Sequence, residues 1–327
     1  MLRMNPFSVC SPNSLDETLD LLDKHGGDAK IHAGGTDILP NIKHELLTPK
    51  FLINIKNLKE LKGVRVEDDT IIIGASSTLS ELLNNKTLLT ELPALCDAIR
   101  QIASPQIRNT GTIGGNICLD TRCLYYNQSH FWRESLGFCL KKDGDTCHVT
   151  KVGRKCVAAA SNDSATVLLT RDTYLTINSL SGEKTIPLSK FYTANGIKNN
   201  VLQDDSLISD IRIKIDKSRR IKNGFSKLRF RKSIDFPLIS LAVSFNVNDD
   251  DVMENCKLVI NALAAKPKEL NVSKFTGQKM KSSLVEEISI YASEKCMPLA
   301  NISGDASWRK SMIAHLCRDA FKKAFNA

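Results

Sequence analysis

The chain has 327 residues and a formal net charge of +9, from 45 basic and 36 acidic side chains. Its composition, 42% hydrophobic and 25% charged, is that of an ordinary globular protein, and its length predicts about two or three domains. The apolar runs are too short for a membrane span, and the N-terminus lacks the apolar segment of a signal peptide, so we expect a cytoplasmic protein. The basic residues are spread along the chain without a nucleic-acid motif, which argues against nucleic acid as a partner.

Residues 1–60 are predicted to alternate short strands and helices. Ser14 followed by Glu17 is typical of a capping box, and the leucine stripe behind it predicts a helix that ends at Gly26-Gly27. A strand at 29–33 then runs into a glycine pair, Thr36 or Asp37 can cap the next helix, and 51–55 is a second strand.

The rest of the chain divides into two further predicted domains, 61–218 and 219–327, with the break in the charged stretch from Asp216 to Arg220. The middle domain is expected to contain a hairpin, three helices and a strand, at 64–66 with 71–73, at 79–83, 93–102 and 165–169, and at 174–177. In the last domain, strands at 225–230, 238–247 and 256–263 precede helices at 283–293 and 308–325. This order predicts an α+β domain with its helices on one face of an antiparallel sheet.

Two glycine-paired segments carry the first functional signal. They read Ala33-Gly34-Gly35-Thr36-Asp37 and Thr110-Gly111-Thr112-Ile113-Gly114-Gly115-Asn116. A glycine pair between a strand and a helix lets the backbone approach a pyrophosphate, and free amides at a helix start can bind it. Neither segment is the GxGxxG fingerprint, and a lone glycine pair is more often only a turn. Two such segments in one chain favour a bound dinucleotide.

Four of the ten cysteines carry the second signal, because they fall within one stretch: Cys123, Cys139, Cys147 and Cys156. The spacing is not the CxxC pairing of a zinc finger, so zinc, a [4Fe-4S] cluster and an insertion with incidental cysteines all remain open. Local basic residues can offset thiolate charge, and four aromatic residues, Tyr125, Tyr126, Phe131 and Trp132, are expected to shield a cluster from water. His130 and His148 are expected to lie outside the ligand set.

The glycine segments, together with 106–116, Lys227–Arg231, Asp235-Phe236 and the Ala265-Lys266-Pro267 turn, resemble the FAD-binding medium subunit of the molybdenum hydroxylase family. Xanthine dehydrogenase and carbon monoxide dehydrogenase carry the same module. The resemblance implies an α+β fold: a two-part FAD-binding domain of the vanillyl-alcohol-oxidase (PCMH) type, followed by an α+β C-terminal domain. The residues that it implies for the cofactor are Ala33, Gly34, Gly35, Thr36, Asp37, Arg108, Thr112, Ile113, Gly114, Gly115, Asn116, Asp163, Lys227 and Asp235. By the same resemblance, the two glycine loops wrap the FAD pyrophosphate and Asp235 lies near the flavin ring.

Residues from about 119 to 159 are an insertion relative to most members of that family. The insertion resembles the one in the β subunit of 4-hydroxybenzoyl-CoA reductase, where four cysteines hold a [4Fe-4S] cluster. The resemblance therefore implies Cys123, Cys139, Cys147 and Cys156 as the ligands of such a cluster.

The implied function is electron transfer within a molybdenum-containing oxidoreductase. The resemblance implies two partners, a large molybdopterin subunit and a small subunit with two [2Fe-2S] clusters, in a dimer of heterotrimers. The main expectation is 4-hydroxybenzoyl-CoA reductase, with ferredoxin as donor and benzoyl-CoA as product. The alternative is an oxidising hydroxylase of the xanthine, aldehyde or carbon monoxide dehydrogenase kind, with outward electron flow. A zinc-bearing scaffold protein and a stand-alone flavin reductase also remain open, and no residue is a candidate for acid–base or nucleophilic catalysis.

Overall fold

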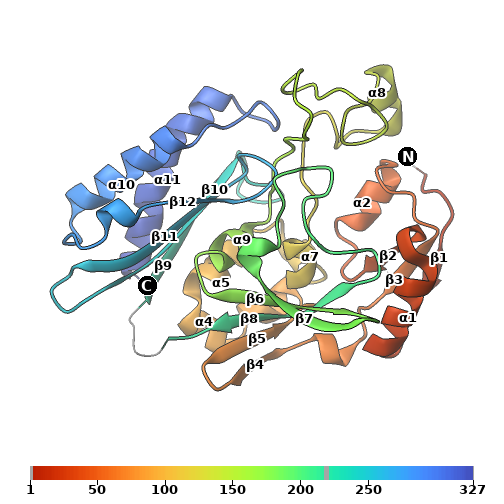
Figure 1. Ribbon diagram of the computed structural model, residues 1–327, viewed down its shortest axis with the longest axis horizontal. Helices are drawn as coiled ribbons and strands as arrows, with labels where there is room; N and C mark the ends of the chain where they lie inside the picture. Colours follow the sequence, from red (N-terminus) through yellow and green to blue (C-terminus); the bar gives the residue numbers. More distant parts are fainter. Residues whose placement is uncertain (1–2, 217–220, 327) are drawn as a thin grey trace.

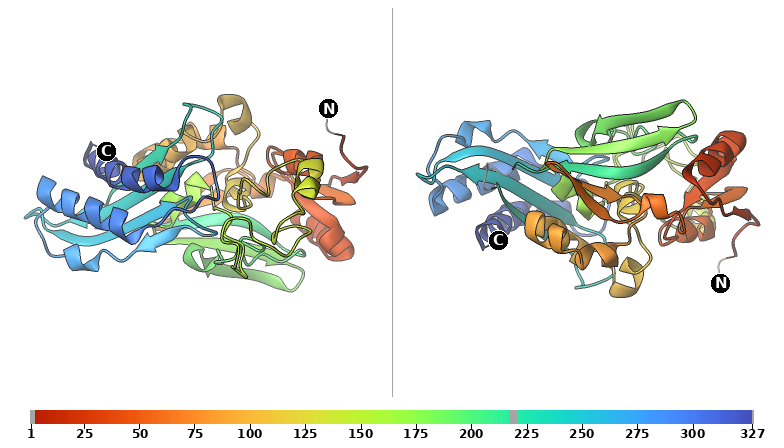
Figure 2. Two further views of the ribbon diagram at one scale, coloured as in Figure 1. Left: turned by 90° about the horizontal axis from the view of Figure 1, so that it is seen from above. Right: turned by 90° about the horizontal axis from the view of Figure 1, so that it is seen from below.

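The structure is a computed structural model, and it describes residues 3–216 and 221–326. It contains three sheets, which follow one another along the long axis of the molecule (Figures 1 and 2). The N-terminal sheet is parallel, with the order β1-β3-β2: β1 is Ser8–Cys10, β2 is Ala29–His32 and β3 is Phe51–Asn54. The helices of this unit are α1 (Leu15–His25) and α2 (Ile38–Lys43).

The first helix begins as predicted, but only half of its capping box forms. The Ser14 hydroxyl accepts a hydrogen bond of 3.1 Å from the Glu17 amide. The Glu17 carboxylate reaches one residue further back, to the amide of Asn13 at 2.7 Å, instead of returning to Ser14. Leu19 and Leu22 of the predicted stripe are buried against the N-terminal sheet. The stripe therefore fixes how α1 covers the sheet.

The central sheet is antiparallel, with the order β4-β5-β8-β6-β7. Its strands are β4 (Val64–Glu67), β5 (Thr70–Gly74), β6 (Thr173–Ser179), β7 (Gly182–Pro187) and β8 (Leu207–Lys214). The helices that precede or pack against it are α3 (Leu79–Leu83), α4 (Lys86–Glu91), α5 (Pro93–Arg100), α6 (Pro105–Arg108), α7 (Ile113–Ile117) and α9 (Asp163–Leu168). Isoleucines from β5 and β8 share one buried core with most of these helices.

The C-terminal sheet is antiparallel, with the order β12-β11-β10-β9. Its strands are β9 (Ile221–Leu228), β10 (Ile239–Val247), β11 (Met253–Asn261) and β12 (Lys268–Leu270), and its helices are α10 (Ser282–Lys295) and α11 (Ala306–Asn326). Both helices cover one face, as the sequence predicts. The opposite face packs against α5 and α9 of the middle unit. Since both faces are covered, every residue of β10 but the last is buried.

The insertion is closed at its base by a backbone pair. The amide of Arg122 donates to the carbonyl of Ala159 at 2.8 Å, and the Ala159 amide donates back at 2.7 Å. The segment between them is mostly irregular and includes helix α8 (His130–Ser135), which lies near α2 (Figure 1). Arg133 of α8 is buried and donates to the carbonyls of His44 and Glu45, just after α2. The insertion is thus fastened to the N-terminal unit.

The α+β fold class is confirmed. The proposed boundary at 218/219 falls within 217–220, outside the described residues, and the three-domain division stays a prediction. Among the described residues, no helix is both long enough and apolar enough to span a membrane.

Candidate functional site

A cavity of about 520 Å³ lies where the three units meet, and we call it the larger cavity. Its volume is within the range of about 300–1,000 Å³ that is usual for ligand sites. Of the residues that the resemblance implies for the cofactor, all but Arg108 and Ile113 line it: Ala33, Gly34, Gly35, Thr36, Asp37, Thr112, Gly114, Gly115, Asn116, Asp163, Lys227 and Asp235. Residues far apart in sequence therefore converge on one space.

The two glycine segments touch each other. A Cβ on Gly34 would lie 2.0 Å from the Thr110 carbonyl oxygen and 2.9 Å from the Gly111 Cα, so only glycine fits there. Gly35 has φ +74°, a conformation that L side chains rarely adopt. The glycines that were predicted to make room for a ligand thus also permit close contact between the two loops.

The amides of the second glycine segment are satisfied inside the protein. Ile113 donates to the Ser77 carbonyl at 3.1 Å and Gly114 to the Ala75 carbonyl at 2.9 Å. Gly115 donates to the hydroxyl of Thr112 at 3.1 Å. These three amides are therefore already paired inside the protein, and the assignment of this segment to the cofactor stays a prediction.

A buried ion pair forms one wall of the larger cavity. Lys227 Nζ lies 2.6 Å from Asp163 Oδ2, and the two side chains are 1% and 3% exposed. Burial raises the pKa of Asp163, while the Lys227 ammonium group opposes that shift. Lys227 also donates to the carbonyl of Gln101 at 3.0 Å, so β9 is tied to the end of α5.

Three buried polar atoms around the larger cavity lack a hydrogen-bond partner among the residues that the structure describes. They are Ser76 Oγ, Ser161 Oγ and Asp163 Oδ1, and all three residues line the cavity. Buried polar groups are almost always hydrogen-bonded, so unpaired ones around a cavity indicate a polar ligand. Neither serine was predicted, because no local motif surrounds them and only the fold brings them here.

The loop after β9 lies at the edge of the larger cavity. Asp235 lines it and forms an ion pair with Arg231, whose hydrogen bonds lower the pKa of that carboxyl below its usual range. The amide of Ile234 donates to the Ala103 carbonyl at 3.0 Å. Both of these residues have positive φ, +59° and +46°, and both line the cavity. Sequence reasoning missed them, since nothing in the residue types signals this conformation.

Two predicted cofactor residues lie away from the larger cavity's lining. Arg108 turns toward the end of α5 and donates to the Ile102 carbonyl at 2.7 Å. Ile113 is completely buried in the core beneath the central sheet. The residue beside Arg108, Ile107, lines the cavity instead.

The four predicted cysteines surround a second, small cavity in the insertion, which we call the cysteine cavity. Its volume is about 20 Å³, and Cys123, Cys139, Cys147 and Cys156 all line it. All four are free thiols. In residues 3–216 and 221–326, no three His, Cys, Asp or Glu side chains are grouped closely enough to hold a single metal ion.

Hydrogen bonds and burial act in opposite directions on these thiols. Burial raises the pKa of Cys123 to about 11 and also raises that of Cys156. At Cys147, hydrogen bonds led by Thr150 outweigh burial and lower the pKa. The Ala158 amide lies 3.4 Å from the Cys156 sulfur. In iron–sulfur proteins, hydrogen bonds to the ligand sulfurs are one of the factors that set the reduction potential.

The expected aromatic shield forms only in part. Tyr125 and Tyr126 line the cysteine cavity. Phe131 and Trp132 face outward instead, with 79% and 38% of their surface exposed, because α8 packs on the protein through the buried Arg133 on its other side. His148 lines the cysteine cavity and its ring Nε2 lies 2.5 Å from the Phe138 carbonyl oxygen.

Comparisons with known proteins account for nearly the whole chain. Residues 5–213 match the family model described as the FAD binding domain in molybdopterin dehydrogenase, and residues 225–324 match that of the CO dehydrogenase flavoprotein C-terminal domain. The chain therefore belongs to the family of FAD-binding medium subunits of the molybdenum hydroxylases. It is an FAD-binding subunit of an oxidoreductase of that family.

Individual relatives agree with this assignment. The chain is 25% identical over 321 residues to the carbon monoxide dehydrogenase medium chain of Hydrogenophaga pseudoflava, covering 98% of this chain and 97% of the relative. It is 29% identical to the nicotinate dehydrogenase FAD-subunit of Eubacterium barkeri, over 76% of this chain and 72% of that one. It is 27% identical to the xanthine dehydrogenase FAD-binding subunit of Escherichia coli O157:H7, over 91% and 88%. A solved structure of the Hydrogenophaga enzyme shares the fold, with a TM-score of 0.80 at 23% identity and 99% coverage of both chains.

Among the relatives named here, all are dehydrogenase subunits, and none is a 4-hydroxybenzoyl-CoA reductase. The comparisons thus support the alternative of an oxidising hydroxylase better than the reductase that was our main expectation.

Proposed function

We propose that the larger cavity holds FAD, with the pyrophosphate against residues 33–37 and the flavin ring toward the loop after β9. The convergence of both glycine segments with Asp163, Lys227 and Asp235 around one polar-lined cavity supports this placement. The amides of residues 113–115 in the second loop are already bonded within the protein, so the first loop is the better phosphate site. When bound, FAD supplies a centre that accepts two electrons and returns them one at a time.

The chain's own residues bind and orient the cofactor in this proposal. Ser76 and Ser161 can donate hydrogen bonds to the cofactor, since neither hydroxyl has a partner among the described residues, and Asp163 Oδ1 can accept one. Lys227 holds the Asp163 carboxylate in place from a neighbouring strand. Gly34, which has no Cβ, allows the two loops that line the cavity to contact each other.

The proposed direction of electron flow is outward. By their names, the relatives above are subunits of dehydrogenases of carbon monoxide, nicotinate and xanthine. By analogy, this chain would receive electrons from a substrate that is oxidised on the large subunit. The proposed partners are that large subunit and a small subunit with two [2Fe-2S] clusters, in a dimer of heterotrimers.

Anaerobic addition of candidate substrates to the purified complex tests this direction. An oxidisable N-heterocycle, an aldehyde or carbon monoxide should bleach the flavin absorbance without any added reductant. The opposite result is that none of these substrates bleaches the flavin, whereas reduced ferredoxin reduces it and 4-hydroxybenzoyl-CoA then reoxidises it. In that case the flow is inward and the outward proposal is wrong.

A second candidate function, a reductase similar to 4-hydroxybenzoyl-CoA reductase, is favoured by the cysteine cavity. Four cysteine side chains that line one cavity, one of which accepts a hydrogen bond from a backbone amide, suit an iron–sulfur cluster, and we propose a [4Fe-4S] cluster there. Tetrahedral zinc would need its four sulfurs about 3.8 Å apart, from Zn–S bonds of about 2.3 Å. No group suited to a single ion is found in the part of the chain that the structure describes, which argues against zinc.

Ferredoxin is the donor that this second function requires. A cluster on this chain would serve as the entry point for its electrons, whereas in the outward direction the same cluster would be an exit. Addition of reduced ferredoxin to the purified complex, followed through the flavin absorbance, distinguishes the two directions of electron flow. An enzyme with outward flow should accept electrons from its substrate and not from ferredoxin.

A further inference from the structure

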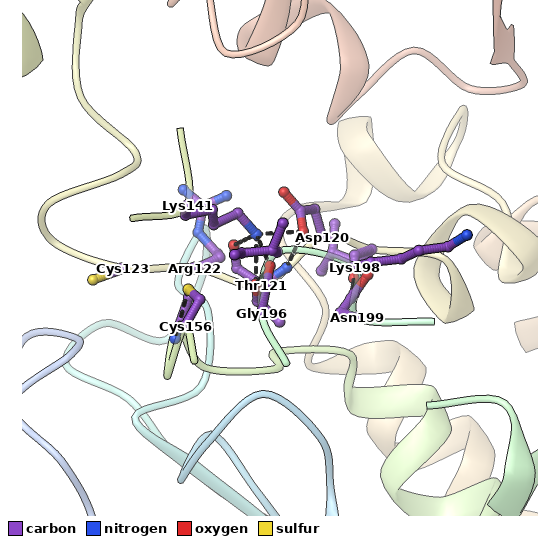
Figure 3. A network of polar contacts seen from close by, with 12 residues as sticks. Asp120, Thr121, Arg122, Cys123, Lys141, Cys156, Gly196, Lys198 and Asn199 are labelled. Atoms are coloured by element: carbon purple, nitrogen blue, oxygen red, sulfur yellow. Dashed lines mark hydrogen bonds and ion pairs between the residues drawn. The ribbon is translucent and has the colours of Figure 1, made fainter. Parts of the chain in front are cut away.

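The two cavities are joined by a short stretch of chain. Cys118 and Leu119 line the larger cavity, and Cys123 lines the cysteine cavity. Only residues 120–122 lie between them along the sequence. The side chains of Asp120 and Thr121 contact a lysine of the insertion, Lys141, and Figure 3 shows this network from close by.

Lys141 is buried although its side chain carries a charge. The side chain is 4% exposed, and Nζ lies 2.7 Å from Asp120 Oδ1. The same nitrogen donates to the Thr121 hydroxyl at 2.6 Å and to the Gly196 carbonyl at 2.6 Å. It also lies 4.5 Å from the centre of the Tyr126 ring. Its ammonium group therefore has a fixed position.

That position faces the cysteines. Lys141 and Tyr126 both line the cysteine cavity, and the Lys141 charge acts on the Cys156 thiol. A cluster with four thiolate ligands carries net negative charge, and a nearby fixed cation in a water-poor site interacts with it strongly. The neighbouring residue Lys142 lies outside the cavity lining and pairs with Asp143 at 3.2 Å, with 34% of its side chain exposed.

The other end of the network reaches the larger cavity. Arg122 lies 3.8 Å from Asp37 Oδ1, and its guanidinium group stacks 3.8 Å above the centre of the Phe236 ring. Both Asp37 and Phe236 line the larger cavity. Asp120 forms an ion pair with Lys141 and also interacts electrostatically with Arg122, so it lies near one cation at each candidate cofactor site.

We propose that Lys141 is a positioning residue that sets the reduction potential of the cluster held by Cys123, Cys139, Cys147 and Cys156, with Asp120 as its counter-charge. The proposal rests on the [4Fe-4S] assignment made above. The fixed cation stabilises the reduced cluster, which carries one more negative charge than the oxidised one. Asp120 acts in the opposite sense and limits how far the potential rises.

The test compares four variants of the full chain, purified anaerobically: Lys141→Met, Lys141→Arg, Asp120→Asn and, as a matched control, Lys142→Met. Iron content is measured first, and the cluster potential is then measured by a redox titration followed by low-temperature EPR. We expect Lys141→Met to shift the potential to more negative values and Asp120→Asn to more positive ones. Lys141→Arg and Lys142→Met should stay close to the unsubstituted chain.

Opposite shifts of the cluster potential in Lys141→Met and Asp120→Asn are the decisive result. If Lys141 were purely structural, its loss would change the iron content, and the direction of any potential shift would not follow the charge that was removed. If Lys141→Met binds no iron, the cluster potentials of Asp120→Asn and Lys141→Arg, compared with that of the unsubstituted chain, still test the proposal. Equal potentials in all variants that retain iron would overturn the role of Lys141 and leave the cluster assignment intact. A chain without iron before any substitution would overturn the cluster, and this inference with it.

Discussion

Lys227 on β9 and Asp163 at the start of α9 form an ion pair whose Nζ–Oδ2 distance is 2.6 Å, with both side chains almost fully buried. The pair joins the C-terminal sheet to the middle unit inside the larger cavity. It is the most direct link between the stability of the fold and the proposed FAD site.

We predict that Lys227→Met costs about 3–5 kcal/mol of unfolding free energy, because it leaves the Asp163 carboxylate buried without its partner. The double variant Lys227→Met with Asp163→Asn should recover much of this loss, since the uncompensated charge is gone. Chemical denaturation of the three proteins measures both effects. Equal stability of the single and double variants would show that the pair is not the source of the loss.

Gly34→Ala should impair FAD binding by forcing apart the two glycine loops. Its Cβ would lie 2.0 Å from a backbone oxygen, and overpacking of this kind costs about 1–3 kcal/mol. The matched control is Gly27→Ala, where the nearest atom to the new Cβ is 3.6 Å away. Flavin absorbance per chain after purification is the measurement, and full flavin content in Gly34→Ala would contradict the role assigned to this contact.

Sequence reasoning located most of the strands and helices because their signals are local. The strands and helices of the C-terminal sheet and the parallel unit at 29–33 and 51–55 follow from apolar runs and glycine punctuation. Twelve of the fourteen implied cofactor residues line the larger cavity. They were identified by resemblance, and composition alone would not have chosen them.

The residues that were missed depend on contacts far apart in sequence. Ser76 and Ser161 reach the larger cavity only through the folded chain. Strand β8, in the middle of the central sheet, was not predicted, although Ile211 and Ile213 alternate with polar residues in the period-2 pattern of a strand. Phe131 and Trp132 of α8 were expected to face the cysteines because they are apolar. In the structure both face outward, and the charged Arg133 is the residue that is buried.

Arg309→Met should destabilise the C-terminal unit. Arg309 on α11 is completely buried and donates to the carbonyls of Leu238, Leu299 and Ala262, at 3.1, 2.8 and 2.6 Å. Leaving these oxygens without donors costs on the order of 3 kcal/mol. The neighbouring Lys310→Met, at a half-buried position without an ion pair in the described residues, should change stability by no more than about 0.5 kcal/mol. A thermal or denaturant midpoint for each variant decides the question, and equal midpoints would refute this role for Arg309.

Single Cys→Ser substitutions distinguish a cluster from incidental cysteines. Each change at Cys123, Cys139, Cys147 or Cys156 should remove most of the iron and the broad visible absorbance, because each removes one thiolate ligand. Cys296→Ser, at a buried position in the C-terminal core, should retain the iron. If the four variants keep as much iron as the control, the cysteines of the insertion are not ligands.

The most direct test of the account is flavin and metal analysis of the anaerobically purified, unsubstituted chain. We predict about one FAD and about four iron atoms per chain, with acid-labile sulfide in the same amount as iron. A chain that binds no flavin when FAD is supplied in excess, or one that carries zinc in place of iron, would contradict it.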